Sequence, residues 1–436
     1  MLIFLGYNEK DTNDSDQPII ILIKTSGVHY NMVVNIHQKQ KILILSGDFG
    51  DGHKQAAQAI LDDCQLNHPN VDVEVVDFME WTHPHLHSVG KFCYIQWVKK
   101  FPSVYGYLFQ KTRNDNLLSS IFKKIRSFSL SRMIKLLNEK QPSVIVSTFP
   151  SAAAAMSILK IQGLTFLPTI TVITDHTDHS YWIHPFTDRY LVASEQVNQA
   201  LQRQNILSSQ IEVTGIPLRA CFNQTFDRDL LRERHNLRRD LSTVMVMGGG
   251  LGMIDKEFIR ILQSDDLPTP MQFVIICGHN MNLKRDLEEK LLHSKHSVKV
   301  TGYINYVHEM MALSDLIVTK PGGLTTSEAL AMELPMLLYK ALPGQERDNS
   351  AFLLRAGVAV QAENSAELLD HLIKLFKNPL TLFKLKDRAK QFQKKAATAQ
   401  AVRSILQIQV EPSLPLSPLA TQRYTHLFFK RKLRSS

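Results

Sequence analysis

Cysteine is scarce in this chain, which has only four among its 436 residues. They lie far apart, and no two of them form a Cys-x-x-Cys pair. Disulfide-stapled folds and structural zinc sites both need paired or clustered cysteines, so neither is indicated here. This cysteine usage is typical of a protein that folds in a reducing compartment. The four positions are Cys64, Cys93, Cys221 and Cys277.

Long hydrophobic runs are missing too. No apolar stretch reaches the roughly 18–20 residues that a membrane-spanning helix requires. The segment from Met1 to Tyr7 is apolar, but it lacks a basic leader and runs into acidic residues, so it does not resemble a signal peptide. We expect residues 1–40 to form a poorly ordered extension, with Met32 as an alternative start.

Composition is otherwise ordinary for a globular protein, with 44% hydrophobic and 21% charged residues. A chain of 436 residues is too long for one ordinary core and suits two domains. The formal net charge of +9 favours an anionic partner, such as membrane lipid, nucleic acid or a phosphorylated substrate.

Apolar, strand-like runs alternate with helical patterns in two series, separated by a charged stretch at 217–242. This alternation predicts an α/β fold with two Rossmann-like, doubly wound parallel-sheet domains, whose ligands bind at the carboxyl ends of the strands in an interdomain cleft. The predicted strands are 41–46, 71–77, 143–148, 168–174, 189–194 and 211–215, then 243–247, 271–277, 298–302, 315–319, 335–339 and 357–361. The predicted boundaries are an extension 1–40, a first domain 41–216, a linker 217–242, a second domain 243–379, a basic helix 380–410 and a flexible basic tail 411–436.

Residues 319–349 (TKPGGLTTSEALAMELPMLLYKALPGQERDN) are the most informative segment. A strand ends in Lys320, and the glycines that follow let backbone N–H groups face outward at the positive end of a helix that starts near Thr325. Glu328, one turn into that helix, can accept two hydroxyl hydrogen bonds. The segment therefore predicts a site for a diphosphate beside a ribose diol, as in a nucleotide sugar.

The first strand runs into SGDFGDGHKQAA (46–57), where His53 opens a helix. One interpretation is a glycine-rich turn with a capping histidine. The other makes His53 a general base, because an imidazolium is disfavoured at a helix N-terminus and the neutral ring accepts a proton near pH 7. Assistance from Asp51 and phosphate binding by His53 are further alternatives.

Gly249, Gly250 and Gly252 follow the strand 243–247 and precede a helix. Such a run suits a dinucleotide fingerprint, a diphosphate cradle or a close packing turn. A nicotinamide site would carry an acidic ribose partner at the end of the next strand, but Cys-Gly-His-Asn stands at 277–280. A diphosphate cradle is therefore favoured.

The stretch TDHTDHSYWIHP (174–185) clusters three histidines around Trp182. Metal binding is one interpretation, but His176, His179 and His184 do not share a helical face. We favour a wall of the interdomain cleft and predict no metal ion.

Segment 91–135 contains ten Lys or Arg residues and one acidic residue, with interleaved aromatics. Such a segment is a helix with a solvated basic face, a nucleic-acid surface or a membrane-binding surface. We favour an anionic bilayer over nucleic acid. The residues predicted to contact acceptor or membrane, with Trp182 of the preceding cluster, are Trp97, Lys99, Lys100, Tyr105, Tyr107, Lys123, Lys124 and Trp182.

With these motifs in order, the chain resembles the family of monogalactosyldiacylglycerol synthases and bacterial processive diacylglycerol glucosyltransferases. A more distant likeness is to the peptidoglycan enzyme that adds N-acetylglucosamine to a lipid-linked precursor. The pieces that carry the family resemblance are SGDFGDGHKQAA (46–57), TDHTDHSYWIHPFTDRYLVASE (174–195), VTGIPL (213–218), VMGGGLG (246–252), CGHN (277–280) and residues 319–349.

The resemblance implies a GT-B fold, with the acceptor and membrane on the N-terminal domain and the UDP-sugar on the C-terminal domain. It implies inverting transfer of glucose or galactose to the glycerol hydroxyl of diacylglycerol, processive if the product re-enters, at the cytoplasmic face of an anionic membrane. His53 would be the base, and no cofactor or obligatory metal is expected. The predicted donor-binding residues are Gly249, Gly250, Gly252, Lys320, Gly322, Gly323, Thr325, Glu328, Gln345 and Glu346.

Two departures from the family pattern are Glu333, where glycine is common, and His176, where an aromatic is more frequent. Other functions remain as alternatives: the lipid-linked N-acetylglucosaminyltransferase, a UDP-sugar epimerase, a nicotinamide dehydrogenase and a non-enzymatic lipid or nucleic-acid binder. A non-enzymatic binder would have no use for residues 319–349.

Overall fold

The computed structural model describes residues 19–25, 28–34, 40–48, 51–84, 100–114, 130–248, 254, 257–267 and 270–408. Strands β1 (Ile19–Thr25) and β2 (Val28–Val34) pair antiparallel, with Ile19 opposite Val34. This regular pairing differs from the poorly ordered extension expected at 1–40. Both strands are rich in Ile and Val, whose branched side chains favour extended backbone.

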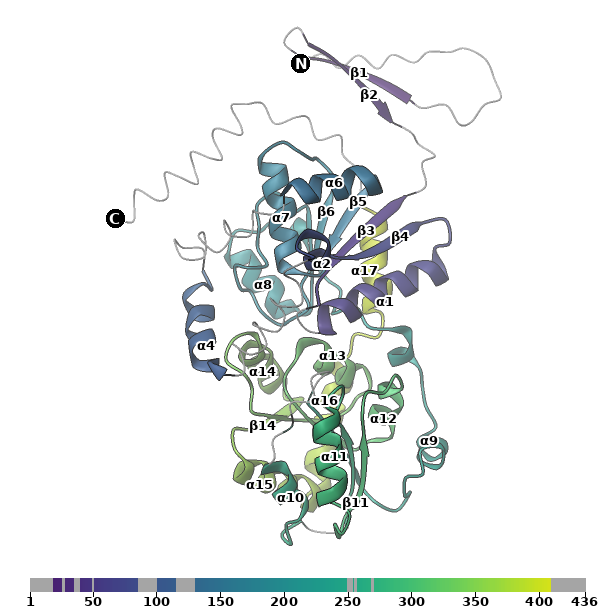
Figure 1. Cartoon of the computed structure of the whole chain (residues 1–436), viewed down its shortest axis with the longest axis vertical. Coiled ribbons are helices and arrows are strands. Elements are labelled where there is room, and N and C mark those ends of the chain that lie inside the picture. Colours follow the sequence, from purple (N-terminus) through teal and green to yellow (C-terminus); the bar gives the residue numbers. More distant parts are fainter. Residues whose placement is uncertain are drawn as a thin grey trace.

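The first domain contains a sheet of six parallel strands in the order β4-β3-β5-β6-β7-β8 (Figure 1). The predicted strands are confirmed, with ends shifted by one or two residues. They are β3 (Lys41–Ser46), β4 (Asp72–Asp77), β5 (Val144–Ser147), β6 (Thr169–Val172), β7 (Arg189–Val192) and β8 (Ile211–Val213). The helices are α1 (Asp51–Asn67), α2 (Phe78–Thr82), α4 (Pro102–Lys111), α6 (Leu130–Lys140), α7 (Pro150–Ile161) and α8 (Glu195–Arg203).

Helices cover both faces of this sheet, as the continuous apolar strands predict. Ile60 of α1 packs with Ile42 and Ile44 on one face, and Met133 of α6 and Met156 of α7 pack on the other. The sheet is therefore a central layer whose carboxyl edge carries the loops of the cleft.

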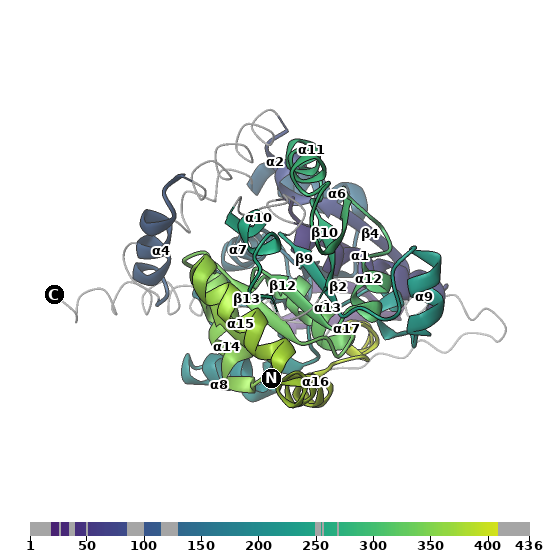
Figure 2. The same ribbon diagram turned by 90° about the horizontal axis from the view of Figure 1, so that it is seen from below.

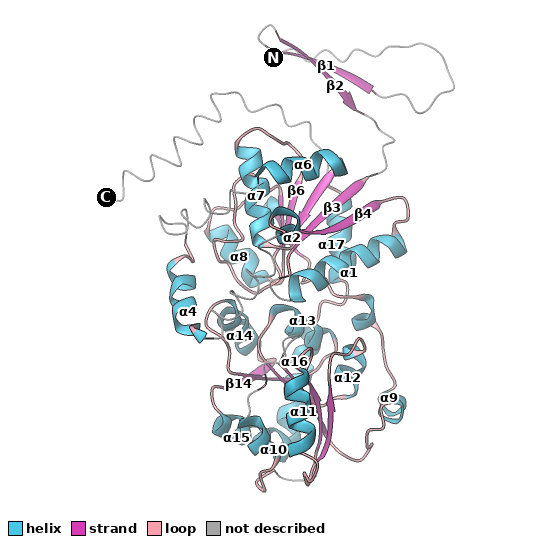
Figure 3. Ribbon diagram, viewed as in Figure 1, coloured by secondary structure: helices cyan, strands magenta, loops and turns pink. Residues whose placement is uncertain are grey.

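The second domain repeats the architecture with parallel strands in the order β11-β10-β9-β12-β13-β14. The strands are β9 (Thr243–Met247), β10 (Gln272–Ile276), β11 (Ser297–Thr301), β12 (Leu316–Thr319), β13 (Met336–Tyr339) and β14 (Ala359–Ala362). The helices are α10 (Glu257–Leu262), α11 (Met281–Lys290), α12 (Val307–Leu313), α13 (Gly323–Ala331), α14 (Gln345–Ala356) and α15 (Ser365–Lys377). Helices again lie on both sides of the sheet, as Figures 2 and 3 show.

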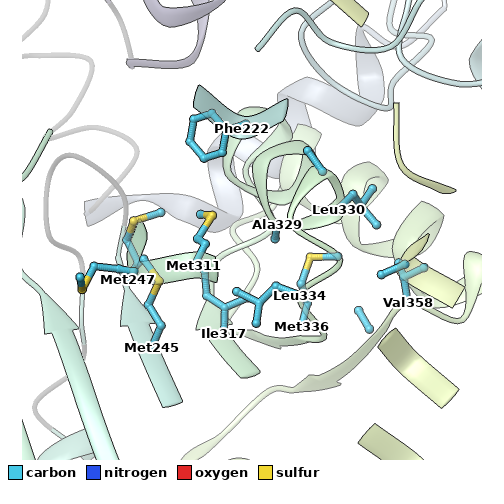
Figure 4. Close-up of a cluster of buried hydrophobic side chains, with 14 of the residues drawn as sticks. Phe222, Met245, Met247, Met311, Ile317, Ala329, Leu330, Leu334, Met336 and Val358 are labelled. Carbon is cyan, nitrogen blue, oxygen red and sulfur yellow. The ribbon is translucent and has the colours of Figure 1, made fainter. Parts of the chain in front are cut away.

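The charged stretch predicted as a linker packs on the second domain. Within it lie the short 3₁₀ helix η3 (Ala220–Asn223) and α9 (Arg228–Arg234). Phe222 is 1% exposed in the same hydrophobic cluster as Met245 and Met311 (Figure 4). Arg228 binds Asp315 in a salt bridge with a nitrogen–oxygen distance of 2.7 Å. Much of the stretch is therefore anchored to the sheet that follows it.

The single C-terminal helix predicted at 380–410 is wrong in one respect, because the structure contains two helices. Helix α16 (Pro379–Phe392) packs on the second domain, and α17 (Ala397–Leu406) returns to the first, where Ile405 joins the core cluster of α1. The many charged residues of α16 led to the prediction of one basic helix, and the apolar face that α17 buries was not recognised.

Two connections between the domains therefore run side by side, at 214–219 and 393–397. Thr398 Oγ1 accepts a hydrogen bond from Leu218 N at 2.8 Å and donates one to Leu218 O at 2.6 Å. Gly215 has φ +89°, and a Cβ there would lie 2.8 Å from Lys394 Cβ. Glycine is needed for both the turn and the close approach.

Candidate active site

The two domains meet at the carboxyl ends of their strands, where α1 of the first domain contacts α13 of the second. A Cβ on Gly52 would lie 3.7 Å from Leu324 Cβ, so the two helix N-termini approach within van der Waals contact. This places the His53 turn beside the glycine turn of residues 320–323.

His53 lies partly exposed in the first turn of α1. Its Nδ1 is 2.9 Å from Thr174 Oγ1 at the end of β6, and its ring packs edge-on against Phe149 and Trp182. Burial lowers the pKa of His53 from 6.5 to about 4, while the Thr148 backbone acts in the opposite direction. The ring is neutral at pH 7, as predicted, but burial among aromatics is the largest cause. Asp51 is exposed at the first position of α1, where a carboxylate complements the helix dipole.

Thr174 contacts both walls of the cleft. A Cβ on Gly323 would lie 2.1 Å from Thr174 O and 2.8 Å from Asp175 Oδ1. The residue that holds the His53 ring therefore also touches the N-terminus of α13. This contact joins the predicted base to the predicted diphosphate cradle.

Asp175 occupies one of the backbone donors of that cradle. The Gly323 N–H donates to its carboxylate, which burial keeps at a raised pKa of about 7 against the lowering effect of Asn349. Gly323 thus provides close packing between the domains in this closed arrangement, which differs from the prediction of an outward-facing donor. The first-turn N–H groups at Leu324 and Thr325 have no acceptor within the helix and are suited to an anion.

Asn349 of α14, which the sequence analysis did not single out, joins the two domains. It is fully buried; its Oδ1 accepts from His176 N at 2.6 Å, and its Nδ2 donates to Asp175 Oδ1 and Pro321 O, both at 2.9 Å. Its place directly after a Gln-Glu-Arg-Asp run, in a segment already assigned to the donor, was the available signal.

Glu328 lies on α13 and is only 7% exposed. Burial raises the pKa of Glu328 to about 8, and Arg219 in the crossing segment opposes the shift. A diol that donates two hydrogen bonds would favour the ionised carboxylate. The geometry therefore fits a polar ligand whose hydroxyl groups stabilise the carboxylate charge that burial disfavours.

The loop before α14 is held by a hydrogen bond within its own domain and by a second one from the first domain. Glu346 Oε2 accepts from Leu342 N at 2.7 Å, and burial raises the pKa of Glu346 while Lys320 opposes the shift. Gln345 Oε1 accepts from Tyr105 Oη at 2.7 Å. Gly248, Lys320, Tyr339 and Lys340 line a cavity of about 290 Å³ nearby, together with Val246, Met247, Ile254, Phe258, Val318 and Thr319.

The residues predicted to contact acceptor or membrane lie in different environments. Trp182 is fully buried in an apolar cluster with Ile173 and Tyr190, so its predicted contact with acceptor or membrane is wrong. Tyr105 faces the donor loop instead of lipid, whereas Tyr107 and Lys100 are exposed. The remaining predicted positions lie outside the described residues: Trp97, Lys99, Lys123, Lys124, Gly249, Gly250 and Gly252.

His176 lines a cavity between the domains, and each of the three histidines has its own partner. His176 stacks on Phe352 at 3.8 Å between ring centroids, and His179 Nε2 is 2.8 Å from Phe109 O. His184 Nε2 is 2.8 Å from Tyr181 O. In the described part of the chain, no three His, Cys, Asp or Glu residues form a metal-binding group.

Two family models match the chain. The model for monogalactosyldiacylglycerol (MGDG) synthase matches residues 53–218, and the model for glycosyl transferases group 1 matches residues 257–397. The first match contains His53 and the Thr174 contact, and the second contains α13 and α14.

Curated relatives resemble the chain over most of its length. A processive diacylglycerol beta-glucosyltransferase of Staphylococcus epidermidis is 34% identical over 351 residues, covering 80% of this chain and 87% of the relative. The enzyme of that name from Bacillus cereus is 29% identical over 391 residues, covering 88% of this chain and 99% of the relative.

Solved structures confirm the GT-B fold. Acinetobacter baumannii MurG matches with a TM-score of 0.53 and 14% identity, covering 85% of this chain and 100% of MurG. The complex of Staphylococcus aureus MnaA with UDP matches with a TM-score of 0.57 and 16% identity, covering 84% and 96%. With the sequence relatives, this fold shows that the chain belongs to the family of processive diacylglycerol beta-glucosyltransferases.

Proposed function

We propose that this chain transfers a hexose from a UDP-sugar to the glycerol hydroxyl of diacylglycerol. The relatives named processive diacylglycerol beta-glucosyltransferase and both family models support this reaction. The observation that carries it is the double contact of Thr174, which places the imidazole of His53 next to the N-terminus of α13.

In this proposal the second domain holds the donor. The first-turn N–H groups at Leu324 and Thr325 face the diphosphate, and the helix dipole stabilises the charge that grows on the leaving group. The ribose diol donates to Glu328, and Gln345 and Glu346 orient the sugar hydroxyls. The protein groups themselves stabilise the departing UDP, so the mechanism uses no obligatory metal.

The first domain provides the base. His53 is neutral at neutral pH, its ring is fixed by Thr174, and part of its surface remains accessible. It removes the proton of the acceptor hydroxyl as that oxygen attacks the anomeric carbon on the face opposite the diphosphate. The configuration at that carbon is inverted. Contact between Gly323 and Thr174 closes the cleft against water, which would otherwise compete as acceptor.

Helix α4 supports a membrane location for the acceptor. Phe101, Val104 and Tyr107 are 56%, 48% and 61% exposed on its outer face, and Lys100 and Lys111 flank them. Exposed aromatics beside cations suit the headgroup zone of an anionic bilayer. None of the described helices is both apolar and long enough to cross a bilayer. We therefore propose peripheral attachment, at the cytoplasmic face where UDP-sugars are made.

The test is incubation with radiolabelled UDP-glucose, or with UDP-galactose, and diacylglycerol in vesicles that contain phosphatidylglycerol. Label is expected in the lipid extract with one of the two donors, in species bearing one or more sugars. A label that remains in free sugar or UDP-sugar would contradict the proposal, and label only on a lipid-linked peptidoglycan precursor would favour that reaction instead.

A further inference from the structure

Helix α4 of the first domain has two chemically different faces. Its outer face carries the exposed Phe101, Val104 and Tyr107. Its inner face carries Tyr105 and lies against the donor loop of the second domain, beside α14 (Figure 1). One short helix therefore contacts the surroundings on one side and the predicted donor site on the other.

The inner contact is too close for any side chain at two glycine positions. A Cβ on Gly106 would lie 2.3 Å from Pro343 Cβ, and a Cβ on Gly344 would lie 2.6 Å from Tyr105 Cε1. Gly344 also has φ +114°, which other residues rarely adopt. Glycine is unfavourable inside a helix, so Gly106 indicates that close docking matters at this point.

Tyr105 makes a directed contact across the domain boundary. Its Oη donates a hydrogen bond of 2.7 Å to Oε1 of Gln345, the first residue of α14. An amide side chain has one oxygen acceptor and one NH₂ donor group. Because Tyr105 occupies the oxygen, it fixes the direction in which the Gln345 NH₂ group points.

Arg113, two residues beyond α4, forms a second contact between the domains. Its Nη1 is 2.5 Å from Asp178 Oδ1 in the first domain, and its Nη2 is 2.5 Å from Asp348 Oδ2 in the second. Asp348 also accepts from Thr177 Oγ1 at 2.6 Å. The end of α4 is thereby held in one place relative to both walls of the cleft.

We propose that Tyr105 is a positioning residue for Gln345, and that through it α4 links bilayer docking to donor binding. The inference rests on the proposed function, in which Gln345 contacts the donor sugar. A bilayer that holds α4 by its outer face stabilises the arrangement of Gln345 that binds the sugar. By linkage, a bound donor then strengthens the attachment of α4 to the bilayer by the same factor.

The first experiment measures steady-state kinetics of Tyr105→Phe with UDP-glucose. The substitution removes only the hydroxyl and keeps the ring on Gly344. The KM for the donor is expected to rise about 5- to 10-fold, the loss of one hydrogen bond, with a smaller change in kcat. Ser103→Ala, which removes an exposed hydroxyl from the same helix, is the matched control and should leave KM unchanged. An unchanged KM in Tyr105→Phe overturns the positioning role.

A double-mutant cycle shows whether Tyr105 acts through Gln345. In a Gln345→Ala background, Tyr105→Phe should have no further effect on KM. If the two effects multiply, Tyr105 acts elsewhere and the inference fails while the donor contact stands. If Gln345→Ala alone leaves the donor KM unchanged, the proposed donor contact is itself wrong, and the inference falls with it.

Calorimetry tests the link to the bilayer. UDP-glucose is titrated into the full chain with and without vesicles of phosphatidylglycerol and phosphatidylcholine that contain no diacylglycerol. Affinity should rise about 5-fold with vesicles in the unmodified protein and in the control Ser103→Ala, but not in Tyr105→Phe. Equal affinity with and without vesicles in the unmodified protein overturns the link.

Discussion

The two walls of the cleft are built from different materials. The wall of the second domain relies on backbone, with the N–H groups of a glycine turn and a helix N-terminus at 322–325. The wall of the first domain relies on side chains, with His53 between Phe149, Trp182 and Thr174. A backbone wall depends on the turn being formed, whereas a side-chain wall depends on what surrounds each group. The substitutions below separate these two dependences.

The largest effect is expected on the side-chain wall. His53→Ala should lower turnover by about 10²–10⁴-fold, because the general base is lost. Binding of UDP-sugar, measured by calorimetry, should persist because the backbone wall is intact. His293→Ala, at an exposed site, is the control. Turnover within a few-fold of the unmodified protein would mean that another group takes the proton.

The junction of the two walls comes next. Asn349→Ala removes three hydrogen bonds at a fully buried site and leaves Asp175, His176 N and Pro321 O without those partners. Unfolding free energy in urea is expected to fall by about 2–4 kcal/mol. Asn138→Ala, at an exposed position of α6, should change it little. A loss no larger than the control's would show that the junction is not needed for stability.

Glu328, a side chain beside the backbone donors of the second domain, gives a pH-dependent test. Its folded-state pKa, raised by burial to about 8, lies above the ordinary value of 4.5. The neutral carboxyl therefore favours the folded state fully below pH 4.5, and that stabilisation is lost as pH rises towards 8. Glu328→Gln avoids this loss, so its Tm should rise relative to the unmodified protein between pH 5 and pH 8.

Thermal melts at several pH values measure this difference, with Glu289→Gln, exposed on α11, as the matched control. The same Gln variant should bind UDP more weakly, since an amide cannot accept from both ribose hydroxyls as a carboxylate does. A Tm difference that does not change with pH would contradict the buried neutral carboxyl.

The smallest effect is expected on the outer surface of α4. Lys100→Gln and Lys111→Gln should each weaken sedimentation with phosphatidylglycerol vesicles by about 5-fold, since a cation near an anionic surface contributes about 1 kcal/mol. The control is the pair Lys384→Gln and Lys386→Gln, exposed on α16. If both pairs behave alike, the charge near α4 has no special part in attachment.

The same division explains what could be predicted. The paired sheets follow from apolar runs, and the glycine turn at 320–323 follows from local sequence, because both depend on the backbone. Trp182 was misplaced because an aromatic among polar residues looks like a surface anchor, while its burial depends on strands β6 and β7 and helix α8 packing around it. The neutral state of His53 was predicted with the wrong main cause for the same reason.

Asn349 and Tyr105 show the same limit. Their roles depend on partners 174 and 240 residues away in the chain, and no local pattern specifies such a pairing. What local sequence did contain was Gly106 in a helix and Gly344 in a turn, two positions where a neighbour approaches closely.

The paired connections at Gly215 and Lys394 restrict how the enzyme can move. The two crossing segments are joined by the hydrogen bonds between Thr398 and Leu218. Together they resist twisting of one lobe about the other, but they permit bending about an axis that passes through both segments. Because α17 is part of the first lobe's core, cutting the chain after residue 216 would leave α1 uncovered. The two lobes can therefore move by a hinge motion about these crossings, and opening the hinge exposes the base and the donor cradle together.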